Sequence, residues 1–338
     1  MIDETLEFKA FEVSEFTGNA APTFSGHIVQ RTVSDLPLGN VLVRVSWSSL
    51  NYKDALSASG NRGVTRTYPH IPGIDASGIV AYSEDSAFQP GDHVLVTGYD
   101  LGMNTSGGFS QYIRIPSRWL VRLPETLSLR HSMVLGTAGL TAALCIEKLL
   151  KNGVRPEQGD VLVTGATGGV GSIAVALLSH LGFCVTACTG KPQQAGYLSL
   201  LGARAIVSRA ELVDSGTRPL LKERWAAAVD VAGGDLLWSI LRSLHYGGSV
   251  AVCGLVGSPA LQASVFPFIL RHVNLLGVDS VNMNYEQRCS LWQKLASEWR
   301  IPQLDSISKT INFNQLDYEL KLMLEGGAVG RRVLDVNA

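Results

Sequence analysis

The chain has 338 residues, a formal net charge of −1, 46% hydrophobic residues and 17% charged residues. This length allows about two domains with sizeable cores, and the composition argues against intrinsic disorder. A nearly neutral chain does not require a basic face, so nucleic acid is not the expected partner. An uncharged apolar run of about 18 residues is absent from the sequence, which argues against a membrane span.

The N-terminal residues and the cysteines favour a cytoplasmic protein. Residues 1–5 are acidic and lack the basic and apolar regions of a secretory signal. The five cysteines are scattered, and an odd count without export suggests reduced thiols. Cys184 and Cys188 flank a predicted strand, so we interpret them as buried apolar thiols rather than metal ligands.

Short apolar runs separated by turns fill the first part of the chain. The alternation predicts strands over residues 24–29, 41–47, 76–82, 92–97 and 109–115. These segments predict a compact antiparallel domain, in the form of a partly open barrel.

The pattern changes after Pro124, where residues 132–150 are apolar at helical spacing. From residue 161 onward, strands and helices alternate, as in a doubly wound parallel sheet. The six predicted strands lie near residues 161–165, 183–188, 204–207, 226–230, 248–253 and 273–279. We expect helices to fill the gaps between these strands, for example over 169–181 and 192–201, and six strands are what two mononucleotide-binding halves require.

The last part of the chain has a mixed pattern. Residues 287–297 and 314–325 suggest helices, and residues 332–336 a terminal strand. We expect this segment to return to the first domain.

A glycine-rich turn follows the apolar strand that begins at Val161. It runs from Gly165 to Gly171 and leads directly into an apolar helix. Glycines allow a sharp turn and a close approach to a ligand, and a helix N-terminus attracts phosphate. The turn therefore predicts a pyrophosphate cradle, although such turns also close ordinary strand–helix junctions. The residues that we expect to bind the dinucleotide here are Ala166, Thr167, Gly168, Gly169 and Val170.

The end of the second predicted strand of this sheet indicates which dinucleotide binds. NAD-specific sites carry an acidic residue about 20 residues after the glycines, to bind the ribose diol. This chain has Thr189, Gly190 and Lys191 there instead. A hydroxyl, a free N–H and an ammonium group suit a 2′-phosphate, so we expect NADPH. The alternative is that Lys191 is only a solvated surface charge.

Motifs along nearly the whole chain, in the right order, resemble a known superfamily. They are Trp47–Leu56, Ile71–Asp75, Leu135–Gly139, Thr164–Gly171, Cys253–Leu255, Pro267–Arg271, Gly277–Ser280 and Gly330–Arg331. With these motifs the sequence resembles the medium-chain dehydrogenase/reductase superfamily, in its zinc-free quinone-oxidoreductase branch. Within that branch it is most similar to the acrylyl-CoA reductase family.

The resemblance implies a GroES-like catalytic domain split around a Rossmann domain. We expect the GroES-like domain over residues 1–132, the NADPH-binding Rossmann domain over 133–281, and the return to the catalytic domain over 282–338. The resemblance also implies a homodimer, in which the last Rossmann strand, Leu275–Ser280, pairs with its twin.

The resemblance also indicates a site without metal. Zinc-dependent relatives place a cysteine where this chain has Asn51 and a histidine where it has Ile74. Residues 98–108 contain no cysteine for a structural zinc cluster, and the seven histidines lack metal-ligand spacing. Chemistry without a Lewis acid fits the reduction of an already activated double bond.

Further cofactor contacts follow from the resemblance alone. Arg209 matches a second phosphate-binding position, with a surface charge as the alternative. Tyr52, Leu255, Ile269 and Ser280 match positions near the nicotinamide, although Leu255 and Ile269 could equally be core residues.

The substrate side centres on residues 51–54, Asn-Tyr-Lys-Asp. The hydroxyl of Tyr52 can bond a carbonyl oxygen or relay a proton, although a phenol is a weak acid. The alternative is that Tyr52 and Asn51 only pack the domain interface, and Asp54 more often braces Lys53 or a backbone N–H than performs catalysis. Arg331 could meet a phosphate of cofactor or substrate, or it could be a surface charge.

The resemblance, together with these residues, implies one hypothesis and leaves two alternatives. The hypothesis is the NADPH-dependent reduction of acrylyl-CoA to propanoyl-CoA, with hydride delivered to the β-carbon. The first alternative is an NADPH:quinone or broad enone reductase, and the second a non-catalytic NADPH-binding protein. A CoA-selective enzyme needs basic residues for the CoA phosphates, and the candidates are Lys53, Arg62, Arg66 and Arg331.

Overall fold

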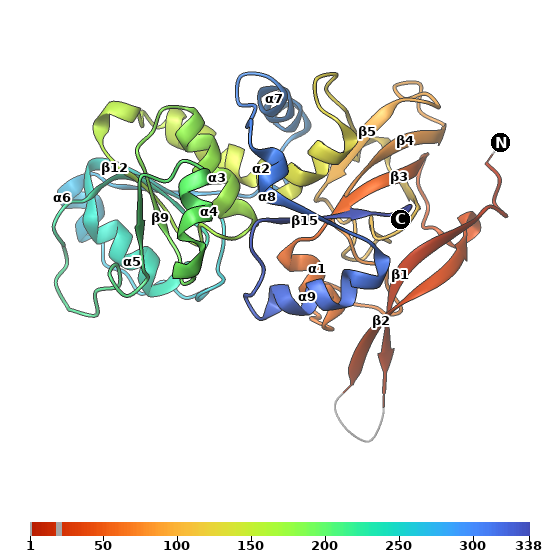
Figure 1. Cartoon of the computed structure of the whole chain (residues 1–338), viewed down its shortest axis with the longest axis horizontal. Coiled ribbons are helices and arrows are strands. Elements are labelled where there is room, and N and C mark those ends of the chain that lie inside the picture. Colours follow the sequence, from red (N-terminus) through yellow and green to blue (C-terminus); the bar gives the residue numbers. More distant parts are fainter. Residues whose placement is uncertain (1, 18–21) are drawn as a thin grey trace. The chain divides into compact units, whose positions relative to one another are not determined.

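The computed structural model describes residues 2–17 and 22–338 and divides into two compact units (Figure 1). Unit 1 consists of Met1–Thr137, Val281–Cys289 and Leu304–Ala338, and unit 2 of Ala138–Ser280 and Ser290–Gln303. The first part of the chain and its last segment therefore belong to one unit. The unit limits differ by a few residues from the predicted domain limits, and residues 290–303 group with unit 2.

Unit 1 is built on a mixed sheet of seven strands with the order β14-β15-β3-β4-β5-β7, in which β6 also pairs with β3. A separate antiparallel pair is formed by β1 and β2. The strands are β1 (Glu7–Phe16), β2 (Thr23–Thr32), β3 (Val41–Ser49), β4 (Asp75–Ser83), β5 (His93–Thr97), β6 (Tyr112–Ile115), β7 (Val121–Arg122), β14 (Ser308–Ile311) and β15 (Arg331–Asp335). The predicted strands of the first domain thus all have counterparts.

The core of unit 1 follows from the sequence alternation of its central strand. Val41, Val43 and Val45 of β3 are fully buried, whereas Arg44 between them is exposed. Val94 and Val96 of β5 lie in the same hydrophobic cluster. The burial of these branched side chains on one face stabilises the sheet, because apolar area is removed from water.

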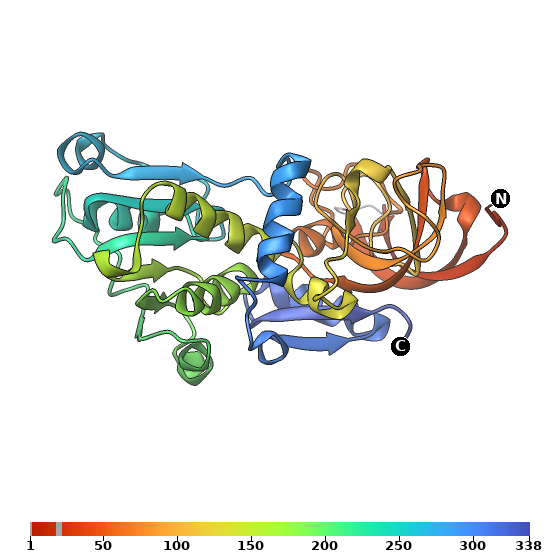
Figure 2. The ribbon, with the colours of Figure 1, turned by 90° about the horizontal axis from the view of Figure 1, so that it is seen from above.

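Unit 2 contains a six-stranded parallel sheet with the order β10-β9-β8-β11-β12-β13. Its strands are β8 (Val161–Val163), β9 (Val185–Cys188), β10 (Ala205–Val207), β11 (Trp225–Asp230), β12 (Leu244–Val252) and β13 (Asn274–Gly277). This order, with β13 at one edge (Figure 2), is that of two mononucleotide-binding halves. The predicted doubly wound sheet is confirmed.

Helices connect these strands close to where the sequence predicts them. The helices α3 (Gly169–His180) and α4 (Ala195–Leu200) correspond to the predicted segments 169–181 and 192–201, and α5 (Gly234–Ser243) and α6 (Phe266–Arg271) form two further crossovers. The expectation that helices fill the gaps fails between β10 and β11, where residues 208–224 form a loop without a helix. Residues 171–178 of α3 are all buried, which is why this helix has no polar face.

Helix α2 (Leu129–Lys151) is interrupted at Gly136, which has a φ of 52° and a ψ of −156°. By length and composition α2 could cross a membrane, which the sequence analysis did not foresee. However, 83% of its apolar window is buried in the structure, as in the core helix of a globular protein.

The remaining helices are α1 (Tyr52–Ala58), α7 (Tyr285–Ala296), α8 (Leu304–Ile307) and α9 (Leu316–Leu324). Helices α7 and α9 and strand β15 are close to their predicted ranges. Helix α1 and strand β14, which runs parallel to β15, were not predicted. Single-turn 3-10 helices lie at Val33–Asp35, Ser117–Trp119, Pro156–Gln158, Pro192–Gln194 and Phe313–Gln315.

Candidate functional site

The glycine turn of unit 2 connects the end of β8 to the start of α3. Gly165 has a φ of 55°, which other residues rarely adopt. A Cβ atom on Gly171 would lie 2.3 Å from the carbonyl oxygen of Gly165, so only glycine allows this turn to close on itself. The turn is tight because two backbone segments pack directly against each other.

The N-terminus of α3 has the properties of an anion site. Gly168 is the N-cap, and it offers no side chain to the N–H groups of the first turn. The helix has 12 residues, so its dipole and these N–H groups favour a bound phosphate. The predicted dinucleotide residues Ala166–Val170 form this turn and the start of the helix.

The residues predicted to select the cofactor come together beside this turn. The hydroxyl oxygen of Thr189, which follows β9, lies 3.4 Å from that of Thr167 and accepts a 3.0 Å hydrogen bond from the N–H of Lys191. The guanidinium of Arg209, after β10, lies against Gly190, with Nε 3.7 Å from the position of an added Cβ. Arg209 is exposed, so the structure gathers a hydroxyl and a cation around the backbone of Gly190.

Asp230, at the carboxyl end of β11, is a buried acid that the sequence analysis did not single out. Its carboxylate accepts hydrogen bonds from the hydroxyl of Thr164 at 2.6 Å and from the N–H of Gly233 at 2.8 Å. Burial raises the pKa of Asp230, and these hydrogen bonds oppose that rise. The signal in the sequence is a single acid at the end of the apolar run 226–230.

The residues expected near the nicotinamide divide into two groups. Leu255 and Ile269 are 60% and 69% exposed, so the alternative that they are core residues is wrong. Ser280 is buried, and its hydroxyl lies 2.7 Å from that of Thr141. Two apolar side chains are thus available to a ligand, whereas Ser280 bonds within unit 2.

In unit 1, Asn51 and Asp54 begin helix α1. Asn51 is the N-cap, and its N–H donates a 2.7 Å hydrogen bond to Oδ2 of Asp54. The other carboxylate oxygen of Asp54 accepts hydrogen bonds from the N–H groups of Gly73 and Ile74, at 3.1 and 2.9 Å. Asp54 thus binds backbone N–H groups, as the sequence analysis considered, and ties the start of α1 to the loop before β4.

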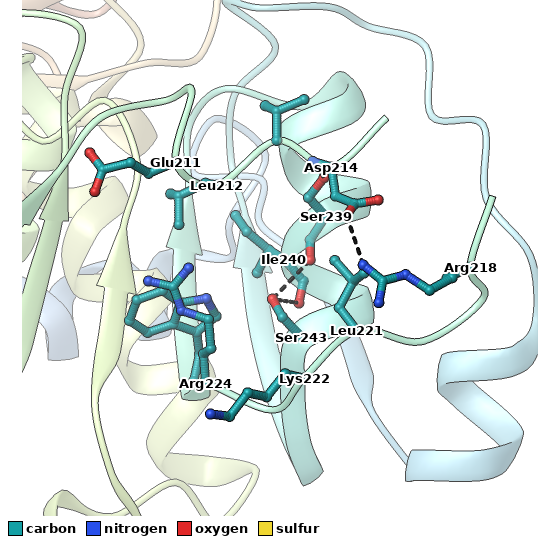
Figure 3. Close-up of a pocket in the computed structure, with 12 residues that line it drawn as sticks. Glu211, Leu212, Asp214, Arg218, Leu221, Lys222, Arg224, Ser239, Ile240 and Ser243 are labelled. Atoms are coloured by element: carbon teal, nitrogen blue, oxygen red, sulfur yellow. Dashed lines mark hydrogen bonds and ion pairs between the residues drawn. The ribbon is translucent and has the colours of Figure 1, made fainter. Parts of the chain in front are cut away.

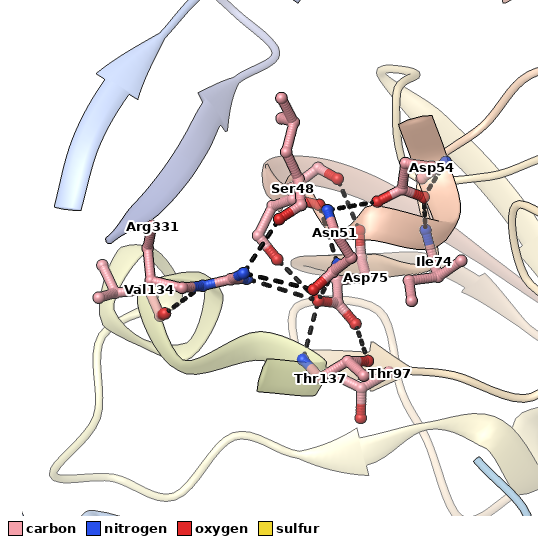
Figure 4. A network of polar contacts seen from close by, with 12 residues as sticks. Ser48, Asn51, Asp54, Ile74, Asp75, Thr97, Val134, Thr137 and Arg331 are labelled. Atoms are coloured by element: carbon pink, nitrogen blue, oxygen red, sulfur yellow. Dashed lines mark hydrogen bonds and ion pairs between the residues drawn. The ribbon is translucent and has the colours of Figure 1, made fainter. Parts of the chain in front are cut away.

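Asp75, the first residue of β4, is the centre of a buried polar network (Figure 4). Its carboxylate accepts hydrogen bonds from Asn51 Nδ2 at 2.8 Å and from the hydroxyl of Ser49 at 2.7 Å. The backbone N–H and the hydroxyl of Thr137 also donate to it. In the sequence Asp75 is only the last residue of the motif Ile71–Asp75, and its position before an apolar segment does not reveal that it is buried.

Arg331 enters the same network, and its placement corrects the expectation from the sequence. It is 3% exposed, so it is not a surface charge. Its guanidinium donates to the carbonyl oxygens of Val134 and Leu50 at 2.9 and 3.0 Å, and Nη2 lies 3.9 Å from Oδ2 of Asp75. Because the side chain is buried and donates to internal carbonyl oxygens, Arg331 is not available to a phosphate at the surface of unit 1.

Asn51 and Tyr52 are adjacent in the chain but differ in their surroundings. Asn51 is 9% exposed, and its carboxamide donates to Asp75 and accepts a 3.3 Å hydrogen bond from Arg331. Tyr52 is the first residue of α1 and 41% exposed, and Lys53 beside it is half-buried. Of the two predicted catalytic side chains, Tyr52 is therefore the one open to a ligand in unit 1.

The other basic residues considered for CoA differ in their availability. Arg62 pairs with Glu15 at 2.5 Å and stacks over the rings of Phe24 and Tyr68. Arg66 is exposed. Lys53 and Arg66 thus remain as the cations of this set that could meet a phosphate.

The part of the chain that the structure describes has no group of three or more histidine, cysteine, aspartate or glutamate side chains that could hold a metal ion. At the positions where zinc-dependent relatives carry ligands stand Asn51 and Ile74. Ile74 is a buried hydrocarbon side chain, and the carboxamide of Asn51 is hydrogen-bonded to Asp75 and Arg331.

A separate pocket of about 270 Å³ lies in unit 2 (Figure 3). Its walls come from the loop before β11 and from α5, and include an ion pair between Arg218 and Asp214. Charges of both signs line it, and none of the residues predicted for the cofactor or substrate is among them.

Comparisons with known proteins agree with this arrangement. The alcohol dehydrogenase GroES-like domain model matches residues 37–125, and the zinc-binding dehydrogenase model matches residues 169–297. Acrylyl-CoA reductase AcuI of Ruegeria pomeroyi is 45% identical over 92% of this chain and 94% of its own length.

Two further relatives have solved structures. Putative quinone oxidoreductase YhfP of Bacillus subtilis is 44% identical over 93% of this chain and 96% of its own length. The crystal structure of YhfP with NAD bound superposes with a TM-score of 0.94 at 42% identity, covering 98% of this chain and 100% of that one. The YhdH oxidoreductase of Salmonella enterica, in complex with NADP, gives a TM-score of 0.93 at 41% identity, over 97% of this chain and 99% of that one.

These matches confirm the expected combination of a GroES-like domain and a Rossmann domain, and they extend over nearly the whole chain. These relatives are all named as reductases or oxidoreductases. The chain belongs to the zinc-binding dehydrogenase family of the medium-chain dehydrogenase/reductase superfamily, in the branch that holds acrylyl-CoA reductases and quinone oxidoreductases.

Proposed function

We propose that this oxidoreductase uses NADPH to reduce the activated C=C bond of acrylyl-CoA, which yields propanoyl-CoA. The observation that most supports NADPH as the cofactor is the position of Arg209 against Gly190, next to the N-terminus of α3, which has no side-chain cap. The substrate is supported by the 45% identity with a relative named acrylyl-CoA reductase.

The residues of unit 2 fit a dinucleotide that carries a 2′-phosphate. The first turn of α3 would hold the pyrophosphate, because its N–H groups have no side-chain cap. The hydroxyl of Thr189, the cation of Lys191 and the guanidinium of Arg209 would hold the 2′-phosphate by charge-assisted hydrogen bonds. An acid that would repel this phosphate is absent from residues 189–191.

The reaction needs a donor for the substrate oxygen. NADPH, when bound, would supply the hydride for the β-carbon, and the thioester oxygen would then have to carry the negative charge of an enolate. The Tyr52 hydroxyl, at the start of α1, would donate a hydrogen bond to that oxygen and stabilise the charge. A proton from Tyr52 or from water completes the reduction at the α-carbon.

The buried network of unit 1 gives Asn51 a positioning role in this proposal. Its side chain bonds Asp75 and Arg331, so it fixes the N-cap from which Tyr52 projects. A donor held in place loses less entropy when the substrate binds.

Quinone reduction is the second candidate, because YhfP, at 44% identity, is named a putative quinone oxidoreductase. The two candidates differ in the acceptor and in the need for cations that bind CoA phosphates. Lys53 and the exposed Arg66 favour the CoA substrate in this chain.

The test is a panel of acceptors with NADPH: acrylyl-CoA, longer 2-enoyl-CoAs, a small enone without CoA, and a benzoquinone. We expect acrylyl-CoA to have the highest kcat/KM, and Tyr52→Phe to reduce its kcat. Tyr246→Phe is the matched control, because Tyr246 is 73% exposed and lies outside the predicted site. Fast quinone turnover with negligible acrylyl-CoA turnover would contradict the proposal, and NADPH binding without turnover of any acceptor would favour a non-catalytic protein.

The homodimer remains a proposal from the family resemblance. Strand β13 lies at the edge of the sheet, and an edge strand can pair with another chain, although the carbonyl oxygen of Gly277 already accepts a hydrogen bond from Lys148. Sedimentation analysis of the wild type and of Leu275→Pro tests it. We expect a wild-type dimer that the proline weakens, because proline removes a donor from the edge strand.

A further inference from the structure

Asp54 is a buried carboxylate that has no role in the proposed mechanism. It is 0% exposed, and its two oxygens accept hydrogen bonds from three backbone N–H groups. One donor is Asn51, the N-cap of α1, and the others are Gly73 and Ile74. Helix α1 and the loop before β4 are far apart in the sequence, and this carboxylate joins them.

The loop on the other side of Asp54 is held firmly in place. Gly73 has a φ of 109°, and a Cβ atom there would lie 2.6 Å from the backbone nitrogen of Phe109. The N–H of Phe109 donates to the carbonyl oxygen of Pro72, and that of Gly108 to the carbonyl oxygen of Gly73. The loop is therefore a fixed anchor, and the first turn of α1 is the part that Asp54 can hold or release.

We propose that Asp54 is a positioning residue for the reductase reaction, because its carboxylate holds the first turn of α1, and with it Tyr52, against the Gly73–Ile74 loop. This inference rests on the proposed function. Asp54 contacts neither substrate nor cofactor in this account, and it acts through the placement of Tyr52.

The charges around Asp54 make its hold on the first turn of α1 dependent on pH. Burial and the neighbouring Asp75 raise the pKa of Asp54 to about 7, against the three N–H hydrogen bonds, which lower it. Arg331 of β15 is the cation of the same cluster, and its charge is shared with Asp75. A proton on Asp54 weakens its bonds to the N–H groups, because a neutral carboxyl group is a poorer acceptor than a carboxylate.

Other elements packed on α1 carry charges that are paired among themselves. On α9, Asp317 binds Lys321, and Glu319 binds Lys309 and Arg332. On β2, Arg31 binds Glu12. Burial lowers the pKa of His70, which lies in the loop before β4, so the titration near neutral pH is assigned to Asp54.

The test compares Asp54→Asn with Ser57→Ala over pH 5.5 to 9, with acrylyl-CoA and NADPH. An asparagine side chain has one acceptor oxygen, so its amide group would face either the N–H of Asn51 or those of Gly73 and Ile74 without a bond at any pH. Ser57 is the matched control, because it is buried on the same helix and loses a 2.7 Å hydrogen bond with Thr65.

We expect the wild-type kcat/KM to rise with pH through about 7, the pKa of Asp54. Asp54→Asn should lose this rise and about tenfold or more of kcat/KM at pH 8, while the dissociation constant of NADPH stays unchanged. Ser57→Ala should keep the rise. The inference is overturned if Asp54→Asn retains the wild-type pH dependence, or if Ser57→Ala loses as much activity.

A second readout separates this inference from the proposed function. Amide hydrogen exchange of Asn51, Gly73 and Ile74, corrected for intrinsic rates, needs no substrate. We expect stronger protection at pH 8 than at pH 6 in the wild type and no such difference in Asp54→Asn. Equal protection at both pH values in the wild type would refute the positioning role, even if acrylyl-CoA were the substrate. Without turnover of any acceptor the proposed function fails, and the claim that Asp54 holds α1 is then decided by exchange alone.

Discussion

Thr137 and Asp75 are separated by 62 residues, and Thr137 gives Asp75 two hydrogen bonds, from its backbone N–H at 2.8 Å and from its hydroxyl at 2.5 Å. The N–H can reach the carboxylate because α2 breaks at Gly136, immediately before Thr137. The break in this helix is therefore part of the polar network of unit 1.

Replacement of Gly136 by alanine should destabilise the protein strongly. A Cβ atom there would lie 2.5 Å from Oδ2 of Asp75 and 2.6 Å from the hydroxyl of Ser49, at a φ of 52°. We expect a loss of about 2–4 kcal/mol in the free energy of unfolding, from strain and overpacking together. Urea unfolding measures this loss.

The matched control is Gly153→Ala, because Gly153 also has a positive φ, of 86°, but nothing lies within 4 Å of its added Cβ. This variant should carry only the conformational penalty, about 1 kcal/mol. Equal losses for the two variants would show that the contact with Asp75 does not matter.

Arg331→Met should reduce stability rather than affinity for a phosphate. It leaves the buried carboxylate of Asp75 without its cation, and it removes the hydrogen bonds that Arg331 donates to the carbonyl oxygens of Leu50 and Val134. We expect a loss of about 3–5 kcal/mol, as for other broken buried pairs. Denaturant unfolding and the KM of NADPH should be measured together, since a stable variant with a raised KM would restore the phosphate assignment.

The cofactor preference should depend on Arg209 and Lys191. Loss of one charge-assisted hydrogen bond to the 2′-phosphate costs about 1.5–3 kcal/mol, so Arg209→Ala and Lys191→Ala should raise the KM of NADPH about tenfold or more. The KM of NADH, which lacks this phosphate, should change little.

Arg204→Ala is the control for Arg209. Arg204 is an exposed arginine immediately before β10, whereas Arg209 follows the end of that strand. If Arg209→Ala raised the KM of NADPH and of NADH equally, Arg209 would not bind the 2′-phosphate. The same conclusion would follow if Arg204→Ala raised the KM of NADPH as much as Arg209→Ala does.

Selectivity for CoA should involve Lys53 and Arg66. Exposed ionic contacts contribute about 0.2–1 kcal/mol each, so each alanine variant should raise the KM of acrylyl-CoA up to about fivefold. The KM of a small enone without CoA should not change. If both acceptors respond alike, these cations do not bind the CoA moiety.

Much of the fold could be predicted from the sequence because its signals are local. The buried strands of unit 2 are continuous apolar runs, and α3 begins at a glycine turn. Helix α1 was missed because it has only seven residues, although Asn51 followed by Asp54 at the third helical position is a capping-box signal.

The buried network could not be predicted in this way, because its contacts join distant segments. Arg331 donates to Val134 and Leu50 across 197 and 281 residues of sequence. An arginine near the end of the chain looks like a surface charge until its partners are known. The motif that contains Asp75 could be recognised, but its role as the acceptor for α1 and α2 required the structure.

The central claim, hydride transfer to the β-carbon of acrylyl-CoA, is tested most directly by isotope transfer. The enzyme is incubated with acrylyl-CoA and NADPH deuterated at C4, with each of the two C4 positions labelled in turn, and the product is analysed by mass spectrometry and NMR. The account predicts propanoyl-CoA with one deuterium at its β-carbon from one of the two labelled cofactors. Propanoyl-CoA without deuterium at that carbon from either cofactor, or no propanoyl-CoA at all, would contradict it.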